Sequence, residues 1–375
     1  MNQILGPSMG RRSLVTGGAA VAFAAATAGR LPGAAAATAT SGPEPAGLLY
    51  LPEVDGDSIA VIDTQARRIV ERIEVGPIAR RPAVMAVAGG QRKLYCDNFG
   101  LLPATVSIID RDAGTHRVLP VASVPLGAFT SNDGSEVFLP EAGFQIEVLS
   151  TETDKIVRRF FYPDIPVGSI MGPDDLLYVG FATGLIGAYH PTTGKVVKPP
   201  IYSGGIATFW YSFSADGRTL FTDTVNTIGV IDMDRWRLRK VIPTSRRSYW
   251  LPTDPGAFTS TLSPDGTKLY VTLFGGTGVL VVDVATERII RTIPTAGVTT
   301  SVSFSGDGTR GYISDLGEST KRLVTPIGEA ITFANLITVG ALGPGQVIVF
   351  DPRTDAIVGP PIATRPGPGC SAWVR

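Results

Sequence analysis

Seven short apolar runs recur along this chain, and each ends at a polar residue that begins a turn. The runs lie at 59–63 (IAVID), 106–110 (VSIID), 146–150 (IEVLS), 186–190 (IGAYH), 228–232 (IGVID), 279–283 (VLVVD) and 347–351 (VIVFD). Their spacing indicates a repeat of roughly 40 to 50 residues, with longer intervals near the carboxyl terminus. Repeats of this size are typical of solenoids and propellers, because one unit alone cannot bury its apolar face.

The clearest repeat spans residues 256–294 and divides into four short strands. Strands are expected at 258–262, 269–273, 279–282 and 288–293, with turns at 263–266 (SPDG), 275–278 (GGTG) and 283–286. The strands are rich in β-branched and aromatic residues, and the turns contain Gly, Pro or Asp. Asp suits such turns because its carboxylate accepts nearby N–H groups, whereas Gly tolerates a positive φ. Seven such units predict an all-β fold, a seven-bladed β-propeller with four-stranded blades.

The two ends of the repeat region are complementary. The first repeat begins at its second strand, near 48–51, and lacks an innermost strand. The chain finishes with residues 369–374 (GCSAWV), which have the pattern of an innermost strand with nothing after it. We therefore expect the carboxyl-terminal strand to complete the first blade and close the ring, which removes an exposed strand edge.

Residues 1–40 have the features of an export signal of the twin-arginine (Tat) type. Arg11 and Arg12 precede an apolar stretch of small residues at 13–29, and 34–40 offers cleavage sites. An ordinary secretory signal or an uncleaved anchor are the alternatives. The stretch contains glycines and ends at Arg30, so no transmembrane anchor is expected after processing. The expected organisation is a leader at 1–40 and one propeller domain at 41–375, secreted or extracytoplasmic.

Charge and cysteine content narrow the function classes. The chain has a formal net charge of +0 and no basic run, which argues against nucleic acid as a partner. Cys96 and Cys370 are its two cysteines. In an exported protein they could form a disulfide, and two buried apolar thiols are the equally weighted alternative.

The repeats resemble the YVTN family of seven-bladed propellers over about residues 47–375. The matching motifs are Ser263-Pro264-Asp265-Gly266, Leu269-Tyr270-Val271-Thr272, Val61-Ile62-Asp63-Thr64 and Arg288–Pro294. The resemblance implies the propeller fold. For function it implies several classes, among them extracytoplasmic binding proteins, lactonase-like enzymes, large subunits of amine dehydrogenases and propeller domains of reductases, and fold does not decide among them.

One face of the predicted disc carries the loops after each second strand together with the links between blades, and ligands usually meet a propeller there. Several of these loops begin with an acid: Glu53, Asp97, Glu141, Asp223 and Asp315. A rim of carboxylates could bind Ca²⁺ or a cationic ligand, or supply a general acid or base. The alternative is that each acid caps its own turn in contact with solvent.

The same face is predicted to carry aromatic and basic groups. The candidate ligand-binding residues are Trp210, Tyr211, Arg246, Arg247, Trp250, Arg80, Arg81 and Arg365. A large aromatic such as Trp210 stands where most repeats have a small residue, so it either narrows the channel or stacks on a ligand. Ordinary packing between blades, with arginine stems on apolar surface, is the alternative. A long insertion at 316–345 is a further candidate, as a lid or a docking element.

Missing motifs exclude most redox-metal relatives. His116 and His190 are the two histidines, so a histidine-rich copper site cannot form. The sequence has neither a C-x-x-C-H haem attachment motif nor a C-x-x-C pair for zinc, and its one G-x-S-x-G match, residues 6–10 (GPSMG), lies in the expected leader and not in the expected propeller. No cofactor is evident, although Ca²⁺ remains a candidate.

Three function hypotheses follow. We favour a non-catalytic scaffold that binds a small molecule or a protein partner at the channel mouth. The second hypothesis is a lactonase-like or lyase-like enzyme at the same mouth, using acid–base or metal-assisted chemistry. The third is the large subunit of a dehydrogenase-like complex whose cofactor lies in another chain.

Overall fold

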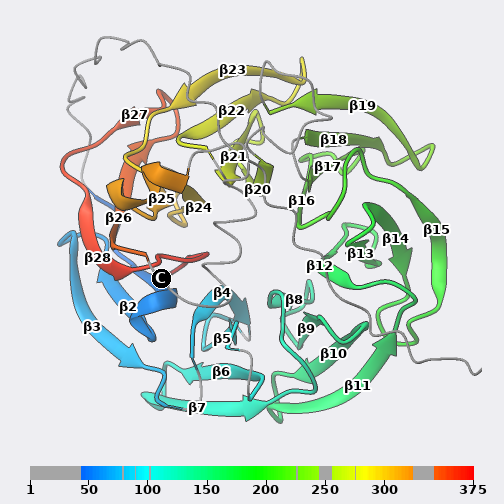
Figure 1. Ribbon diagram of the computed structural model, residues 1–375, viewed down its shortest axis with the longest axis horizontal. Helices are drawn as coiled ribbons and strands as arrows, with labels where there is room; N and C mark the ends of the chain where they lie inside the picture. Colours follow the sequence, from blue (N-terminus) through cyan, green and yellow to red (C-terminus); the bar gives the residue numbers. More distant parts are fainter. Residues whose placement is uncertain are drawn as a thin grey trace, which may run out of the picture. The chain divides into compact units, whose positions relative to one another are not determined.

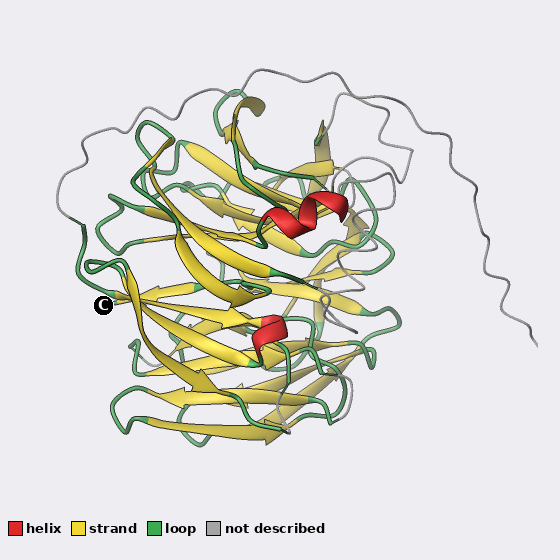
Figure 2. Cartoon of the chain, turned by 60° about the vertical axis from the view of Figure 1, so that its left-hand side comes forward, coloured by secondary structure: helices red, strands yellow, loops and turns green. Residues whose placement is uncertain are grey.

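The computed structural model describes residues 44–77, 80–88, 90–100, 103–224, 227–244, 256–274, 276–323 and 342–375. These residues belong to one compact unit, Ala37–Arg375. They form seven antiparallel sheets arranged in a ring (Figure 1). Helical structure in the described residues is confined to two short 3-10 turns, η1 (Val54–Gly56) and η2 (Glu318–Leu323) (Figure 2). The predicted seven-bladed β-propeller is confirmed.

Each sheet is one blade; the blades are numbered in chain order, and the strands of each run from the innermost to the outermost. Blade 1 has β29 (Ala372–Val374), β1 (Leu48–Glu53), β2 (Ser58–Asp63) and β3 (Arg68–Glu74), and blade 2 has β4 (Pro82–Ala88), β5 (Lys93–Asn98), β6 (Thr105–Asp110) and β7 (Thr115–Pro120). Blade 3 has β8 (Phe129–Thr130), β9 (Glu136–Glu141), β10 (Gln145–Ser150) and β11 (Lys155–Phe161), and blade 4 has β12 (Pro166–Met171), β13 (Leu177–Phe181), β14 (Leu185–Tyr189) and β15 (Val196–Tyr202). Blade 5 has β16 (Trp210–Phe213), β17 (Thr219–Thr224), β18 (Thr227–Asp232) and β19 (Arg237–Pro243), and blade 6 has β20 (Gly256–Leu262), β21 (Lys268–Phe274), β22 (Val279–Asp283) and β23 (Arg288–Ile293). Blade 7 has β24 (Thr299–Phe304), β25 (Gly311–Asp315) and β26 (Pro344–Asp351), with β27 (Ala356–Ile357) and β28 (Ile362–Pro366) both pairing with β26.

The Asp-Gly turns form as their sequence predicts. In blade 6 the Ser263 hydroxyl donates to Asp265 Oδ1 (2.6 Å), which also accepts the N–H of Thr267 (3.0 Å). Gly266 has a φ of +71°. A side chain at that position would be strained, so glycine sets where the chain reverses between β20 and β21.

The ring closes through the carboxyl-terminal strand, as predicted. β29 pairs with β1 in an antiparallel register that sets Val374 opposite Leu48 and Trp373 opposite Leu49. Just before β29, the Cys370 N–H donates to the carbonyl of Ala83 in blade 2 (2.8 Å). The last residues of the chain therefore join blade 1 to its neighbour as well as completing it.

Buried polar contacts recur between neighbouring blades. Asp154 of blade 3 accepts a hydrogen bond from the Tyr95 hydroxyl (2.5 Å) and pairs with Lys93 (2.8 Å), both in blade 2. Asp355 of blade 7 makes the same two contacts with Tyr270 (2.6 Å) and Lys268 (2.9 Å) of blade 6. A Lys-Leu-Tyr run in one blade thus holds a turn of the next.

Within the described residues, no helix combines the length and the apolar character needed to cross a membrane.

We expect deletion of residues 370–375 to open the ring. The deletion exposes the fully buried Val374 site and leaves the edge of β1 unpaired, which should lower stability by on the order of 5 kcal/mol and promote association. Thermal unfolding followed by circular dichroism and size-exclusion chromatography measure both effects. Deletion of the exposed Arg375 alone is the control. A melting temperature unchanged by the longer deletion would contradict this account of closure.

Candidate functional site

An apolar cavity of about 30 Å³ lies in the central channel. Its lining comes from five consecutive blades, namely Val84 and Phe99 of blade 2, Leu126 of blade 3, Val167 of blade 4, Phe209 and Trp210 of blade 5, and Phe258 of blade 6. These residues lie at or near the starts of innermost strands, or just after a second strand, on the face with the blade links. A cavity of this size has room for about two water molecules, but an apolar lining offers water no partners.

Two aromatic contacts shape the cavity. Trp210 packs against Phe129 of blade 3 with ring centroids 5.1 Å apart, and Phe209 packs against Phe258 with centroids 6.0 Å apart. Trp210 and Phe258 also pack against a buried cluster that includes Val54, Leu316, Leu342 and Cys370. Trp210 therefore lies at the channel, as the sequence predicts. Phe99 and Phe258 were missed, although both occupy places close to the channel in the repeat.

Tyr211 has a different role from its neighbour Trp210. Its ring is buried between blades 4 and 5, and its hydroxyl donates to the carbonyls of Gly168 (3.0 Å) and Thr208 (2.8 Å). A Cβ on Gly180 would lie 2.1 Å from this hydroxyl, so the close approach requires glycine there. The structure places Tyr211 in packing between blades, not at the cavity.

All five acids proposed for the rim are fully buried, and they fall into two sets. Glu53, Glu141 and Asp315 each pair across the sheet with a polar residue of the third strand. Asp97 and Asp223 lie one residue earlier in the repeat, opposite Val106 and Ile228. Because successive side chains in a strand point to opposite faces, the two sets face different ways. The solvent contact expected under the capping alternative is therefore not found, and the five carboxylates do not all face the same way.

The first set holds the links between blades. Each carboxylate accepts a hydrogen bond from a side chain of the adjacent strand and from a backbone N–H of the segment that precedes its own blade. The donors are Ser58 Oγ (2.6 Å) and Arg365 N (2.8 Å) for Glu53, Gln145 Nε2 (2.6 Å) and Ser123 N (3.0 Å) for Glu141, and Gln346 Nε2 (2.8 Å) and Ala296 N (3.0 Å) for Asp315. We interpret these three acids as structural.

Asp97 and Asp223 lie directly behind the cavity lining. Asp97 Oδ1 accepts the N–H of the lining residue Val84 (2.6 Å), and its other oxygen is buried without a partner among the described residues. Asp223 pairs across the sheet with Trp210. Ser260 approaches its carboxyl group, yet neither oxygen makes a hydrogen bond of normal geometry with any described residue. Burial raises the pKa of Asp97 well above its usual range and that of Asp223 to about 7.

The basic candidates on this face are paired with acids of blade 1. Arg81 pairs with Asp55 (2.7 Å), and the more exposed Arg80 pairs with Asp57 (3.3 Å). Arg365 pairs with Glu74 (2.7 Å). The first two ion pairs fasten the β1–β2 loop to blade 2, and the third joins the end of β3 to β28. Arg246, Arg247, Trp250 and most of the 316–345 insertion lie outside the described residues.

In the part of the chain that the structure describes, no three His, Cys, Asp or Glu side chains are grouped closely enough to hold a metal ion. Ca²⁺ binding at the rim stays a prediction. Both cysteines are free and buried, so the candidate disulfide between Cys96 and Cys370 is absent from the structure. The two thiols lie near different carbonyls, that of Asp97 for Cys96 (3.4 Å) and that of Thr300 for Cys370 (3.6 Å).

The fold places the chain among the seven-bladed β-propellers. It is similar to a protein from Lactobacillus plantarum (TM-score 0.68, 14% identity, 88% of this chain and 100% of that one). It is also similar to the dihydro-heme d1 dehydrogenase NirN in complex with DHE (0.57, 14%, 90% and 77%) and to Kuenenia stuttgartiensis hydrazine synthase (0.53, 16%, 76% and 95%). At these identities the likeness concerns the fold alone. No protein-family model and no curated protein matches the sequence, so the YVTN assignment stays a prediction.

We expect Asp223→Asn to change how stability depends on pH. The folded state holds the Asp223 proton up to about pH 7, whereas the unfolded chain releases it near pH 4. As pH rises between these values, the free energy of unfolding of the wild type should therefore fall, relative to that of the variant, by on the order of 1.4 kcal/mol per pH unit. Urea unfolding at pH 4, 5.5 and 8 measures this difference.

Asp283→Asn is the opposite control, since hydrogen bonds from Thr286 lower the pKa of Asp283. That variant should keep a constant deficit in stability relative to the wild type from pH 8 down to about pH 4, and lose this deficit only as pH falls further. Parallel pH profiles for wild type and Asp223→Asn would show that Asp223 is ionised throughout.

Proposed function

We propose that this propeller is an exported, non-catalytic scaffold that binds a small apolar or aromatic group at its channel mouth. The observation that supports this proposal is the cavity, to which five blades each contribute apolar side chains. Such a lining favours an apolar group by about 25 cal/mol per Å² of surface removed from water. The site requires little rearrangement, because its residues lie on or beside strands.

The size of the cavity limits what enters it. A space of about 30 Å³ admits a methyl group or a ring edge, so most of a ligand would lie above the mouth. Leu342 belongs to an apolar cluster beside the cavity, and Phe258, which lines the cavity, packs on the same cluster. The bound group could belong to a free small molecule or to a partner protein.

The buried acids suit a neutral ligand. Asp97 and Asp223 have no cationic partner among the described residues, and burial favours their protonated forms. In their protonated forms these two groups place no negative charge behind the apolar lining, which favours a neutral ligand. The likeness of the fold to NirN favours the dehydrogenase-like subunit as the second candidate.

Unbiased small-molecule capture tests this proposal. The full chain, isolated from its native host, is denatured, and released compounds are identified by mass spectrometry. Trp210→Ala should reduce the captured ligand about tenfold, because it removes a central aromatic contact. Trp236→Ala is the matched control, since Trp236 is also half-buried but packs between outer strands of blades 4 and 5. Equal capture by both variants would argue against the channel mouth.

A further inference from the structure

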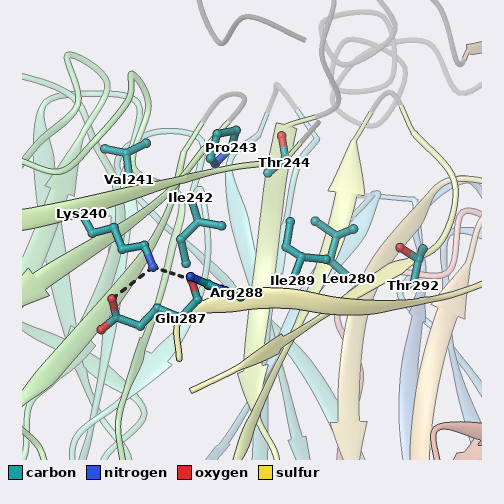
Figure 3. Close-up of a pocket in the computed structure, with 10 residues that line it drawn as sticks. All are labelled: Lys240, Val241, Ile242, Pro243, Thr244, Leu280, Glu287, Arg288, Ile289 and Thr292. Carbon is teal, nitrogen blue, oxygen red and sulfur yellow. Dashed lines mark hydrogen bonds and ion pairs between the residues drawn. The ribbon is translucent and has the colours of Figure 1, made fainter. Parts of the chain in front are cut away.

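A groove of about 750 Å³ opens at the perimeter between blades 5 and 6. One side is formed by Lys240–Thr244 at the end of β19, and the other by Glu287, β22 and β23 (Figure 3). Its volume is within the range of small-molecule sites, about 300 to 1,000 Å³. It lies among outermost strands and is separate from the channel cavity.

The residue just before the outermost strand differs between blades 5 and 6, on the two sides of blade 5. Trp236 and Glu287 occupy the same place in their repeats, just before the outermost strand, and both have a positive φ (48° and 53°). Trp236 donates to the carbonyl of Pro199 (2.7 Å) and packs against Tyr178, so it fills the space between blades 4 and 5. Glu287 instead forms ion pairs with Arg239 and Lys240 of β19. Among the described residues that line the groove, none contributes an aromatic ring to fill the space beside it.

The groove has an apolar part and a charged part. Ile242 and Leu280 are 5% exposed, and with Ile289 they form the apolar part. Lys240, Glu287 and Arg288 gather at the other side in Figure 3. Lys240 donates to the Glu287 carbonyl (2.7 Å). Apolar and cationic surface thus adjoin within one groove.

The charges in this groove do not balance. The Glu287 carboxylate is shared by Arg239 and Lys240, so two cations face one anion. Arg288 is exposed and makes no side-chain hydrogen bond or ion pair with any residue that the structure describes. Asp283 lies opposite Arg288 in the β22–β23 register, but its Oδ1 accepts hydrogen bonds from the Thr286 N–H and hydroxyl. A net positive charge therefore borders the apolar part.

We propose that this groove binds an amphipathic carboxylate of the medium-chain fatty-acid type. The carboxylate pairs with Arg288 and Lys240, and the hydrocarbon chain covers the exposed part of Ile289, above the largely buried Ile242 and Leu280. A guanidinium is well suited to this, because it offers a carboxylate two parallel hydrogen bonds. Burial of each further methylene should raise the affinity about fourfold, so affinity should rise with chain length.

Isothermal titration of the full chain with decanoate at low ionic strength tests the proposal. Arg288→Gln should weaken binding about tenfold. Arg68→Gln should leave binding unchanged, because Arg68 holds the same place at the start of an outermost strand, is also exposed, and lies in blade 1. Ile289→Glu, at a partly exposed site, should abolish binding by adding an acid to the groove.

Two comparison ligands separate the contributions of charge and chain. Decan-1-ol should bind more weakly than decanoate because it lacks the negative charge. Butyrate should also bind more weakly than decanoate, because it lacks the long hydrocarbon chain. The proposal is overturned if decanoate shows no saturable binding, or if Arg288→Gln and Ile289→Glu bind it like the wild type. Equal affinity for decan-1-ol would also overturn it, because the cations would then have no part in recognition.

Discussion

Closure of the ring is the constraint on which the other features of this structure depend. Each blade buries both of its faces against neighbours, and only a closed ring gives the first and last blades the same protection. Leu49 and Leu51 of blade 1 pack against Tyr312 and Val347 of blade 7 in one buried cluster. Without β29, blade 1 would lack its innermost strand, and both this interface and the wall of the channel would be incomplete.

Hydrogen bonds between innermost strands show how closure is maintained near the axis. The Thr259 hydroxyl of blade 6 donates to the carbonyl of Thr300 in blade 7 (2.8 Å). The Thr300 hydroxyl donates in turn to the carbonyl of Pro368 (2.7 Å), just before the closing strand. Hydroxyl contacts of this kind join blades 5 to 7 and the closing strand, whereas the cavity is lined by apolar residues of blades 2 to 6. The channel is therefore asymmetric, and its apolar part is where a ligand is best accommodated.

The acids show how far sequence reasoning reached at the candidate site. Glu53 and Asp97 both come at the end of a hydrophobic second strand, so the sequence motif predicts that they lie in the same ring of carboxylates. They differ by one position in the repeat, and in a strand that difference turns a side chain to the opposite face. Glu53 consequently holds a link between blades, whereas Asp97 lies behind the cavity lining. Trp210 was predicted at the channel because it is large where other repeats are small, but its ring partner Phe129 and the other lining residue Phe258 come from other blades.

The sequence by itself determined the repeat, the number of blades, the turns and the closing strand. These features depend on local periodicity and turn chemistry, which are legible within some forty residues. Only the tertiary structure decided which carboxylates lose water, which arginines are paired, and where space is left between blades. Those outcomes depend on side chains that meet between different sheets, as when Trp236 fills the space between blades 4 and 5, whereas Glu287 forms ion pairs beside the groove between blades 5 and 6.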